Sequence, residues 1–256
     1  ADTGASVLVV ADRARDADGA QAEAAAATLM AAMRRLAPQF AVSLPTPQQG
    51  LAQAVALARA GGGLVAVTDP GDNPLSGGVC DTPELFRALL DARIELPCVF
   101  ASFADPDAVR RAHEAGLGGL CELALGGRVS ADFGPPVRAA FRVERYTDGE
   151  FSNIGPMETG VRTSCGRTAL LSLRDRPNLR VIVTESVAPA NDPGFFALHG
   201  IALDQVRLLC VKAKNHFRAA FQPLCAAIID VDAPGPAALD LRLLPFRHAR
   251  APRPRC

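Results

Sequence analysis

The chain is poor in aromatic residues and has no excess of charge, and both features narrow what it can be. Its 256 residues include no tryptophan, one tyrosine and only 5% aromatic residues in all. We therefore expect a core built from Ala, Val, Leu and Ile. The 27 basic and 27 acidic residues cancel to a formal net charge of zero. This balance argues against nucleic acid or an anionic membrane as the main partner, because both favour a basic excess.

Long apolar runs, signal-peptide features and cysteine pairs are also missing. No apolar stretch approaches the roughly 18 residues of a membrane span, so none is expected. The N-terminus has no basic segment before an apolar one, and both ends look like cuts within a longer protein. The seven cysteines are scattered singly, without a CxxC pair. Buried, reduced thiols in a cytoplasmic protein are the expected result.

Sequence motifs for metal binding or nucleophilic catalysis are absent as well. There is no HExxH, no Asp-x-His and no Cys/His cluster at ligand spacing, and the four histidines are far apart. No GxSxG, P-loop or GxGxxG motif occurs either. We therefore assign no metal ligand and no catalytic residue to this chain.

The first half of the chain alternates apolar runs with helical patterns. Strands are predicted at 6–10, 40–44, 63–69, 96–103 and 119–127, and helices at 17–36, 47–60, about 83–90 and 105–116. In the second helix, Leu51, Val55 and Leu57 are expected on a buried stripe. Strands that alternate with helices imply a parallel sheet with right-handed crossovers.

From about residue 135 the pattern changes to alternating apolar and polar residues. Val137, Phe141 and Val143 alternate with Arg138, Arg142 and Glu144, which indicates antiparallel strands with one wet face. Beyond them we predict strands at 178–186, 207–214 and 226–232, and helices at 192–200 and from about 217. The predicted fold is α/β, with a mostly parallel sheet, helices on both faces and an antiparallel β insertion.

A loop rich in oxygens and glycines follows the predicted strand at 63–69. Its polar and glycine residues are Asp69, Asp72, Asn73, Gly77, Gly78 and Asp81. Thr82 is a candidate N-cap for the helix that follows, with Pro83 at its first position. Backbone amides of this turn could bind an anion, or its carboxylates could orient a substrate amine or support a metal. The alternative is a turn in which Asp and Asn cap loose backbone donors.

A second candidate cluster is cationic and lies at the end of the strand predicted at 207–214. Lys212, Lys214, His216 and Arg218 occur within seven residues. Such a group could clamp a carboxylate or phosphate, and His216 could transfer a proton. The alternative is a solvated strand end where Arg218 closes an ion pair.

Several spaced segments resemble, in order, the C-terminal region of the microcystinase C (MlrC) family of zinc metallopeptidases or amide hydrolases. They are "DPGDNPLSGGVCDTPELFRALL", "DPDAVRRAHEAGLGG", "LALGGR", "GPPV" and "VKAKNHFRAAFQPL". The resemblance implies that residues 69–247 form the family's C-terminal α/β domain. It also implies that residues 1–68 end the catalytic N-terminal domain, and 248–256 remain as a basic, Pro-rich tail.

The same resemblance implies a division of work between this chain and an absent domain. Zinc and its Asp and His ligands would lie in that upstream domain, so this chain alone would be inactive. Residues of the two clusters would contact a peptide or amide substrate, and the uncovered face would favour self-association. Two alternatives stay open: a non-catalytic module that binds a small anion through the 71–78 loop with Lys212 and Arg218, and a docking domain.

Overall fold

The computed structural model describes residues 5–40 and 42–240, and the chain divides into two compact units. Of the described residues, 5–40, 42 and 43 belong to the smaller unit, and 44–240 belong to the larger. In the smaller unit, helix α1 (Ala20–Leu36) continues into a short 3-10 helix, η1 (Ala37–Phe40). No residue of α1 is buried. The predicted helix at 17–36 is therefore confirmed, although it packs no side chain into a core.

The strands predicted at 6–10 and 40–44 are wrong for the residues that the structure describes. Residues 5–10 and 42–44 are outside any strand, and Phe40 belongs to η1. Leu8 and Val10 are 89% and 86% exposed. A strand forms only where its backbone groups pair with a neighbour, and no described strand lies beside these segments.

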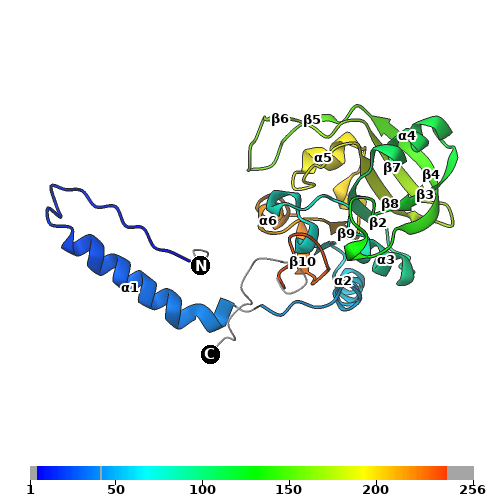
Figure 1. The fold of residues 1–256 in the computed structure, drawn as a ribbon. Helices are drawn as coiled ribbons and strands as arrows, with labels where there is room; N and C mark the ends of the chain where they lie inside the picture. The colour runs from blue at the N-terminus through cyan, green and yellow to red at the C-terminus, as the bar shows by residue number, and fades with distance from the viewer. Residues whose placement is uncertain (1–4, 41, 241–256) are drawn as a thin grey trace. The chain divides into compact units, whose positions relative to one another are not determined.

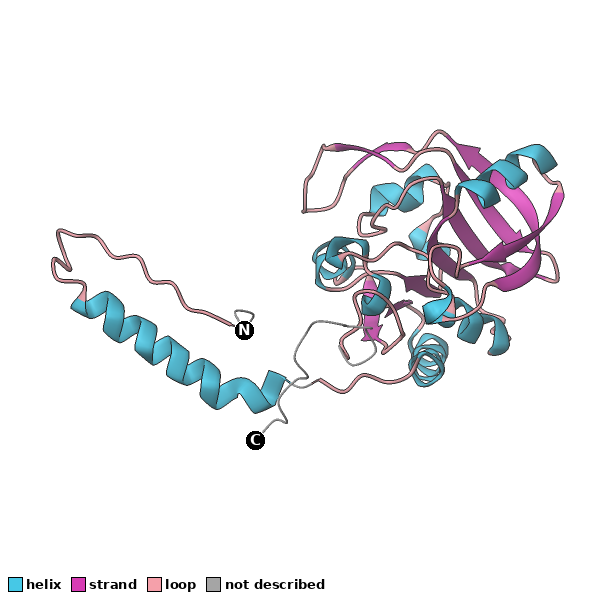
Figure 2. Cartoon of the chain, viewed as in Figure 1, coloured by secondary structure: helices cyan, strands magenta, loops and turns pink. Residues whose placement is uncertain are grey.

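The larger unit is built on an eight-stranded mixed sheet (Figures 1 and 2). The strand order is β10-β1-β9-β2-β8-β7-β4-β3. The bounds are β1 Leu64–Thr68, β2 Cys98–Ala104, β3 Leu120–Leu125, β4 Val137–Thr147, β7 Thr168–Leu173, β8 Arg176–Thr184, β9 Leu208–Val211 and β10 Cys225–Asp230. The pairs from β10 to β8 are parallel, and those from β8 to β3 are antiparallel. A separate hairpin pairs β5 (Glu150–Ser152) with β6 (Arg162–Ser164).

Helices cover both faces of this sheet, as predicted. They are α2 (Pro47–Gly61), α3 (Glu84–Asp91), α4 (Pro106–Ala115), α5 (Pro193–Leu198) and α6 (Asn215–Phe221). Side chains of α2, α3 and α4 join one buried cluster, whereas those of α5 and α6 join another. From Cys98 to Ala101, side chains of β2 alternate between the clusters, because successive residues of a strand point to opposite faces. A register irregularity between Ala101 and Phe103 returns Phe103 to the first cluster. The predicted α/β class is confirmed.

Strand β3 differs from the predicted parallel arrangement. It pairs antiparallel with β4, and Leu125 lies opposite Val137. Only the loop at 126–136 separates the two strands. A connection without a crossover helix returns the chain beside the strand it has just left, which produces an antiparallel pair.

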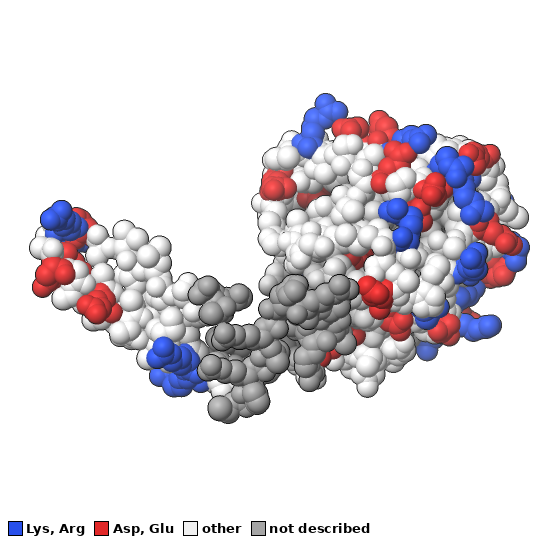
Figure 3. Space-filling view, in the orientation of Figure 1, with Lys and Arg blue, Asp and Glu red and all other residues white. Residues whose placement is uncertain are grey.

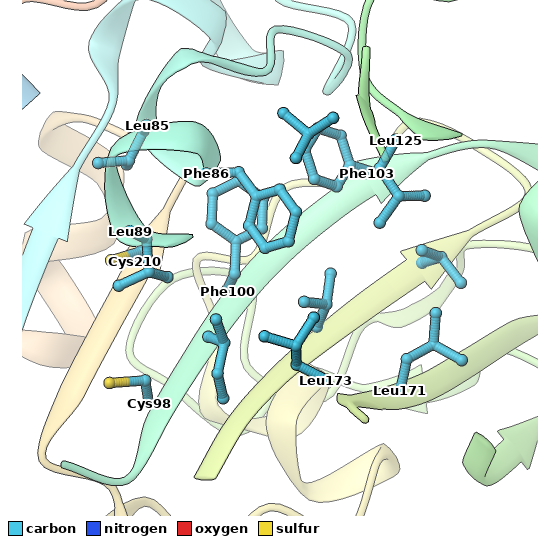
Figure 4. Close-up of a cluster of buried hydrophobic side chains, with 14 of the residues drawn as sticks. Leu85, Phe86, Leu89, Cys98, Phe100, Phe103, Leu125, Leu171, Leu173 and Cys210 are labelled. Atoms are coloured by element: carbon cyan, nitrogen blue, oxygen red, sulfur yellow. The ribbon is translucent and has the colours of Figure 1, made fainter. Parts of the chain in front are cut away.

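The predicted core composition omitted phenylalanine, which supplies the largest buried side chains. Eight are almost fully buried: Phe86, Phe100, Phe103, Phe141, Phe195, Phe196, Phe217 and Phe221. In the cluster of Figure 4, the ring centroids of Phe86 and Phe100 lie 5.0 Å apart, and those of Phe100 and Phe103 lie 4.9 Å apart. A low overall aromatic content therefore did not mean a core without aromatic residues.

The predicted buried stripe of α2 is confirmed at Leu51 and in part at Val55, which packs against the core, but it is wrong at Leu57. Leu51, Ala54 and Ala58 are buried, whereas Leu57 is 47% exposed. Positions three and seven residues beyond Leu51 share its face of a helix, and position 57 does not. The helix begins with a capping box made by Thr46 and Gln49.

The state of the described cysteines and the mixed charges of the surface agree with what the composition predicted. Six cysteines are unpaired; four of them are buried and two half-buried, which confirms the predicted reduced thiols. Acidic and basic side chains are interspersed over the visible face of the larger unit (Figure 3). Within residues 5–40 and 42–240, no helix combines the length and apolarity that crossing a bilayer requires.

Candidate functional site

The sheet topology brings the two predicted polar clusters together at one point. Asp69 directly follows β1, and Lys212 directly follows β9, which is the parallel neighbour of β1. The Lys212 Nζ atom lies 3.0 Å from Asp72 Oδ2 and 3.5 Å from Asp69 Oδ2. The side chains of these three residues are at most 1% exposed. The result is a buried cluster of two carboxylates and one ammonium group at the carboxyl ends of parallel strands.

Asp72 holds the loop that follows it through its carboxylate. Oδ1 accepts hydrogen bonds from the amides of Val79 (2.7 Å) and Cys80 (3.1 Å). Oδ2 accepts from the amides of Asp81 (2.7 Å) and Thr82 (2.8 Å). Four successive amides thus surround one anion, and that anion is a side chain of the same loop.

Lys212 and Asp72 stabilise each other in their charged forms. Burial tends to raise the pKa of Asp72, but Lys212 and the amides of Thr82 and Val79 outweigh it, so the pKa lies below its ordinary value. Burial also tends to lower the pKa of Lys212, but the two carboxylates raise it above its ordinary value. For the fully buried Asp69, burial prevails and raises the pKa. Lys212 and Asp72 are therefore an ion pair at neutral pH.

The N–H donors of the Lys212 ammonium group are all used within the protein, so none is left for an external anion. Besides the carboxylates, Nζ donates to the carbonyl oxygen of Thr82 (2.6 Å) and to its Oγ1 (2.7 Å). Nζ also lies over the rings of Phe100 and Phe103, 5.7 and 5.5 Å from their centroids. Thr82 was predicted to cap α3. Its hydroxyl instead bonds Lys212 and Asp72, and α3 begins at Glu84 without a side-chain cap.

The glycines of the loop have separate backbone roles. Gly77 adopts a φ of +90°, which glycine tolerates better than other residues. At Gly78, an added Cβ would lie 2.3 Å from the carbonyl carbon of Asp72. The loop therefore needs glycine once for conformation and once for close approach of the backbone.

Asn73 and Asp81 also bond to backbone groups. Asn73 Oδ1 accepts from the amide of Leu75 (3.2 Å), which confirms the alternative of an Asx turn at this residue. Asp81 Oδ2 accepts from the amide of Val129 (2.6 Å), so Asp81 ties this loop to the segment after β3. Substrate contact by the residues of this loop stays a prediction.

Arg218 and His216 lie apart from the buried cluster. The Arg218 Nη2 atom lies 3.0 Å from Asp230 Oδ1, so the predicted alternative of an ion pair is confirmed for this residue. Asp230 also accepts a hydrogen bond from the Thr68 hydroxyl. His216 is exposed at the start of α6. Asp230 was not predicted, although it ends an apolar strand as Asp69 does.

Two buried polar residues outside these clusters, Asp192 and His199, were not among the predicted site residues. Asp192 caps α5 through the amide of Gly194 (2.7 Å) and accepts from the amides of Ile154 and Gly155 beyond β5. His199 directly follows α5 and is fully buried. Its ring nitrogens lie 2.7 Å from the Phe195 carbonyl oxygen and 2.9 Å from Thr168 Oγ1.

The described residues do not fit a catalytic metal. No group of three or more His, Cys, Asp or Glu side chains within residues 5–40 and 42–240 is placed to hold one. Asp69 and Asp72, two buried carboxylates of the loop, already face Lys212 and backbone amides. Their oxygens are engaged by hydrogen-bond donors, which a metal ion would have to displace.

Comparison with known proteins shows the family of this chain. Residues 67–248 match the family described as MlrC C-terminus. The chain therefore belongs to the MlrC C-terminus family. It is 28% identical to Microcystinase C of Sphingomonas sp over 186 residues, which is 72% of this chain and 35% of that protein.

A solved structure supports the same relationship. It comes from Mesorhizobium sp. BNC1 and is provisionally described as a metallopeptidase. It matches with a TM-score of 0.77 and 29% identity, over 87% of this chain and 43% of that chain. The chain thus spans less than half the length of these relatives. The MlrC relationship predicted from the sequence is confirmed, and the family is of metallopeptidase type.

Proposed function

We propose that the chain is the C-terminal portion of a zinc-dependent metallopeptidase or amide hydrolase of the MlrC type. The observation that carries the proposal is the family match over residues 67–248. Zinc, when bound, would polarise the amide carbonyl of a peptide-like substrate. Because the described residues do not fit a metal site, its ligands would belong to an upstream domain. Unpaired cysteines support a reducing, cytoplasmic location.

The part of this chain would be to present a rigid loop to the substrate. Leu75, Ser76 and Gly77 form an exposed tip, whereas Asp69 and Asp72 at its base are fully buried. Ligands of parallel α/β sheets gather at the carboxyl ends of the strands, where this tip lies. The tip would line the cleft opposite the metal-binding domain, and the buried cluster would position it.

The test compares two exposed leucines in the protein expressed from the full reading frame. Leu75 and Leu57 are both 47% exposed, but only Leu75 lies on the loop tip. Leu75→Ala is expected to lower kcat/KM for a peptide amide by about fivefold, as loss of one apolar contact predicts. Leu57→Ala is expected to leave it unchanged. Equal kcat/KM for both variants, with equal thermal stability, would refute the role of the loop.

Zinc analysis tests the placement of the metal separately. The chain of residues 1–256, purified and dialysed, is expected to retain far less than one zinc ion per molecule. The product of the full reading frame is expected to retain zinc and to hydrolyse the amide. Stoichiometric zinc in the shorter chain, or a reading frame that encodes nothing upstream, would contradict the proposal.

A further inference from the structure

A groove runs between α4 and β3, apart from the buried cluster. It consists of two adjoining hollows of about 260 and 330 Å³ that share Arg111, Leu123 and Ala124. The first hollow is also lined by Arg128 and Pro136, and the second by Glu122, Arg138 and Arg174. We call this the α4–β3 groove. The volume of each hollow is close to the lower limit of about 300 Å³ for sites that bind small organic ligands.

Two guanidinium groups of the groove are uncommitted. Within the described residues, neither Arg111 nor Arg138 has a hydrogen bond or an ion pair. On α4 the neighbouring acids pair instead with Arg110, which lies 3.5 Å from Asp107 and 2.7 Å from Glu114. Arg111 is thereby left to face the groove alone.

The groove contains other charged groups, and all but Glu122 of the second hollow form ion pairs. Asp105 is buried and caps α4 through the amide of Ala108 (3.0 Å). Arg128 lies 3.9 Å from Asp105 Oδ1 and donates to the carbonyl oxygen of Ala104 (3.4 Å). Arg174 pairs with Asp175 at 2.9 Å. The lining carries four arginines against the carboxylates of Asp105, Asp107 and Glu122, so positive charge prevails, and Arg111 and Arg138 are the arginines without an ion pair.

Apolar side chains lie between these charges. Leu123 is 3% exposed at the bottom of the groove, and Ala124, Ala139 and Pro136 complete its apolar lining. A planar guanidinium pairs with a carboxylate through two parallel hydrogen bonds, which makes Arg the usual residue for recognising this group. We propose that the α4–β3 groove binds a small carboxylate-bearing ligand with an apolar body, held by Arg111 and Arg138.

The groove lies within residues 105–174, so the chain of residues 1–256 can be tested directly. The probe is N-acetylleucine, titrated by calorimetry at low salt, because salt screens exposed charges. N-acetylleucine amide has the same body without the charge and is the matched ligand. We expect saturable binding of N-acetylleucine with a Kd on the order of 1 mM, and binding of the amide at least about tenfold weaker.

Variants assign the binding to the groove. Arg111→Gln and Arg138→Gln are each expected to weaken N-acetylleucine binding by about tenfold, the loss expected for one charge-assisted contact. Arg162→Gln, an equally charged change at a side chain that is 78% exposed on β6, is the control and should bind as the parent chain does. All are surface changes, and equal thermal unfolding midpoints would verify folding.

Three results would overturn the proposal. The first is no saturable binding of N-acetylleucine, and the second is equal binding of its amide. The third is unchanged binding by both Arg111→Gln and Arg138→Gln. Inorganic phosphate is titrated in parallel, and phosphate that displaces N-acetylleucine at lower concentration would overturn the assignment to carboxylates.

Discussion

At the scale of single residues, Asp72 explains why the loop after β1 is so rich in oxygens and glycines. The sequence suggested a nest of amides that could bind an external anion, and the structure places Asp72 in that nest. Gly78 brings the nest close enough to Asp72 for this to occur. The feature that looked like a binding loop is thus a loop that binds its own carboxylate.

Removing the Asp72 carboxylate is expected to be severe. Asp72→Ala leaves Lys212 with only Asp69 as a counter-ion and frees four amides, and it should lower the free energy of unfolding by about 3–5 kcal/mol. The measurement is urea unfolding of this chain at pH 7. Asp107→Ala, at a side chain that is 77% exposed, is the control and should change it by less than about 0.5 kcal/mol. Similar values for both variants would mean that the cluster does not hold the loop.

His199 makes the stability of the larger unit depend on pH. Burial lowers the pKa of His199 from 6.5 to about 4, although its bond to the Phe195 carbonyl opposes this. As the pH falls, His199 therefore binds a proton near pH 6.5 in the unfolded chain but only near pH 4 in the folded chain. The stabilising contribution is fully present above pH 6.5 and is lost as the pH falls toward 4.

A histidine variant isolates this contribution. The difference between 6.5 and about 4 corresponds to about 3 kcal/mol of unfolding free energy. His199→Gln should be less stable than the parent chain at pH 7, but its stability should fall less between pH 7 and pH 4.5. The check is urea unfolding at several pH values, with the exposed His216→Gln as control. Parallel pH profiles for His199→Gln and the parent chain would exclude the assignment.

At the scale of elements, substitutions of the adjacent Gly77 and Gly78 test two different requirements of the loop: backbone conformation at Gly77 and close packing at Gly78. Gly77→Ala places a side chain at a φ of +90° with no atom within 4 Å, and should cost about 1 kcal/mol. Gly78→Ala forces a Cβ against the backbone of Asp72, and should cost about 2–3 kcal/mol. Thermal unfolding of both variants gives the comparison. A larger loss for Gly77→Ala would show that the loop can move away from Asp72.

Most elements of the larger unit were predictable because their signals are local. The apolar run before Asp69 and the Asp105 cap followed by Pro106 both lie where the sequence indicated. Strand pairing is not local, so the direction of β3 and the absence of a strand at 6–10 could not be inferred from the runs themselves. Both depend on which neighbour is present, and sequence periodicity does not specify the neighbour.

At the scale of the whole molecule, the site was predictable only in part, because its contacts also join residues far apart in the sequence. Asp69, Asp72 and Lys212 were each singled out as polar residues at or just after predicted strand ends, but the sequence did not show that the two strands are neighbours. Their common partner Thr82 lies 130 residues from Lys212 and was assigned to a helix cap instead. Asp230, which holds Arg218, was missed although it too ends a parallel strand. Contacts between residues far apart in sequence pair the charges of Asp69, Asp72 and Lys212, which sequence patterns could not show.

The proposed upstream domain has a consequence for α1 that can be measured. Helix α1 buries none of its 17 residues, and an isolated helix of this length is marginal in water even when rich in alanine. In the chain of residues 1–256, amides of α1 should therefore exchange with solvent far faster than those of β2, which is buried throughout. In the product of the full reading frame, packing against the upstream domain should slow the exchange of α1 by at least about 100-fold, with β2 as the internal reference. Strong protection of α1 in the shorter chain, or no gain in the longer one, would contradict the prediction that residues 1–68 end a catalytic domain.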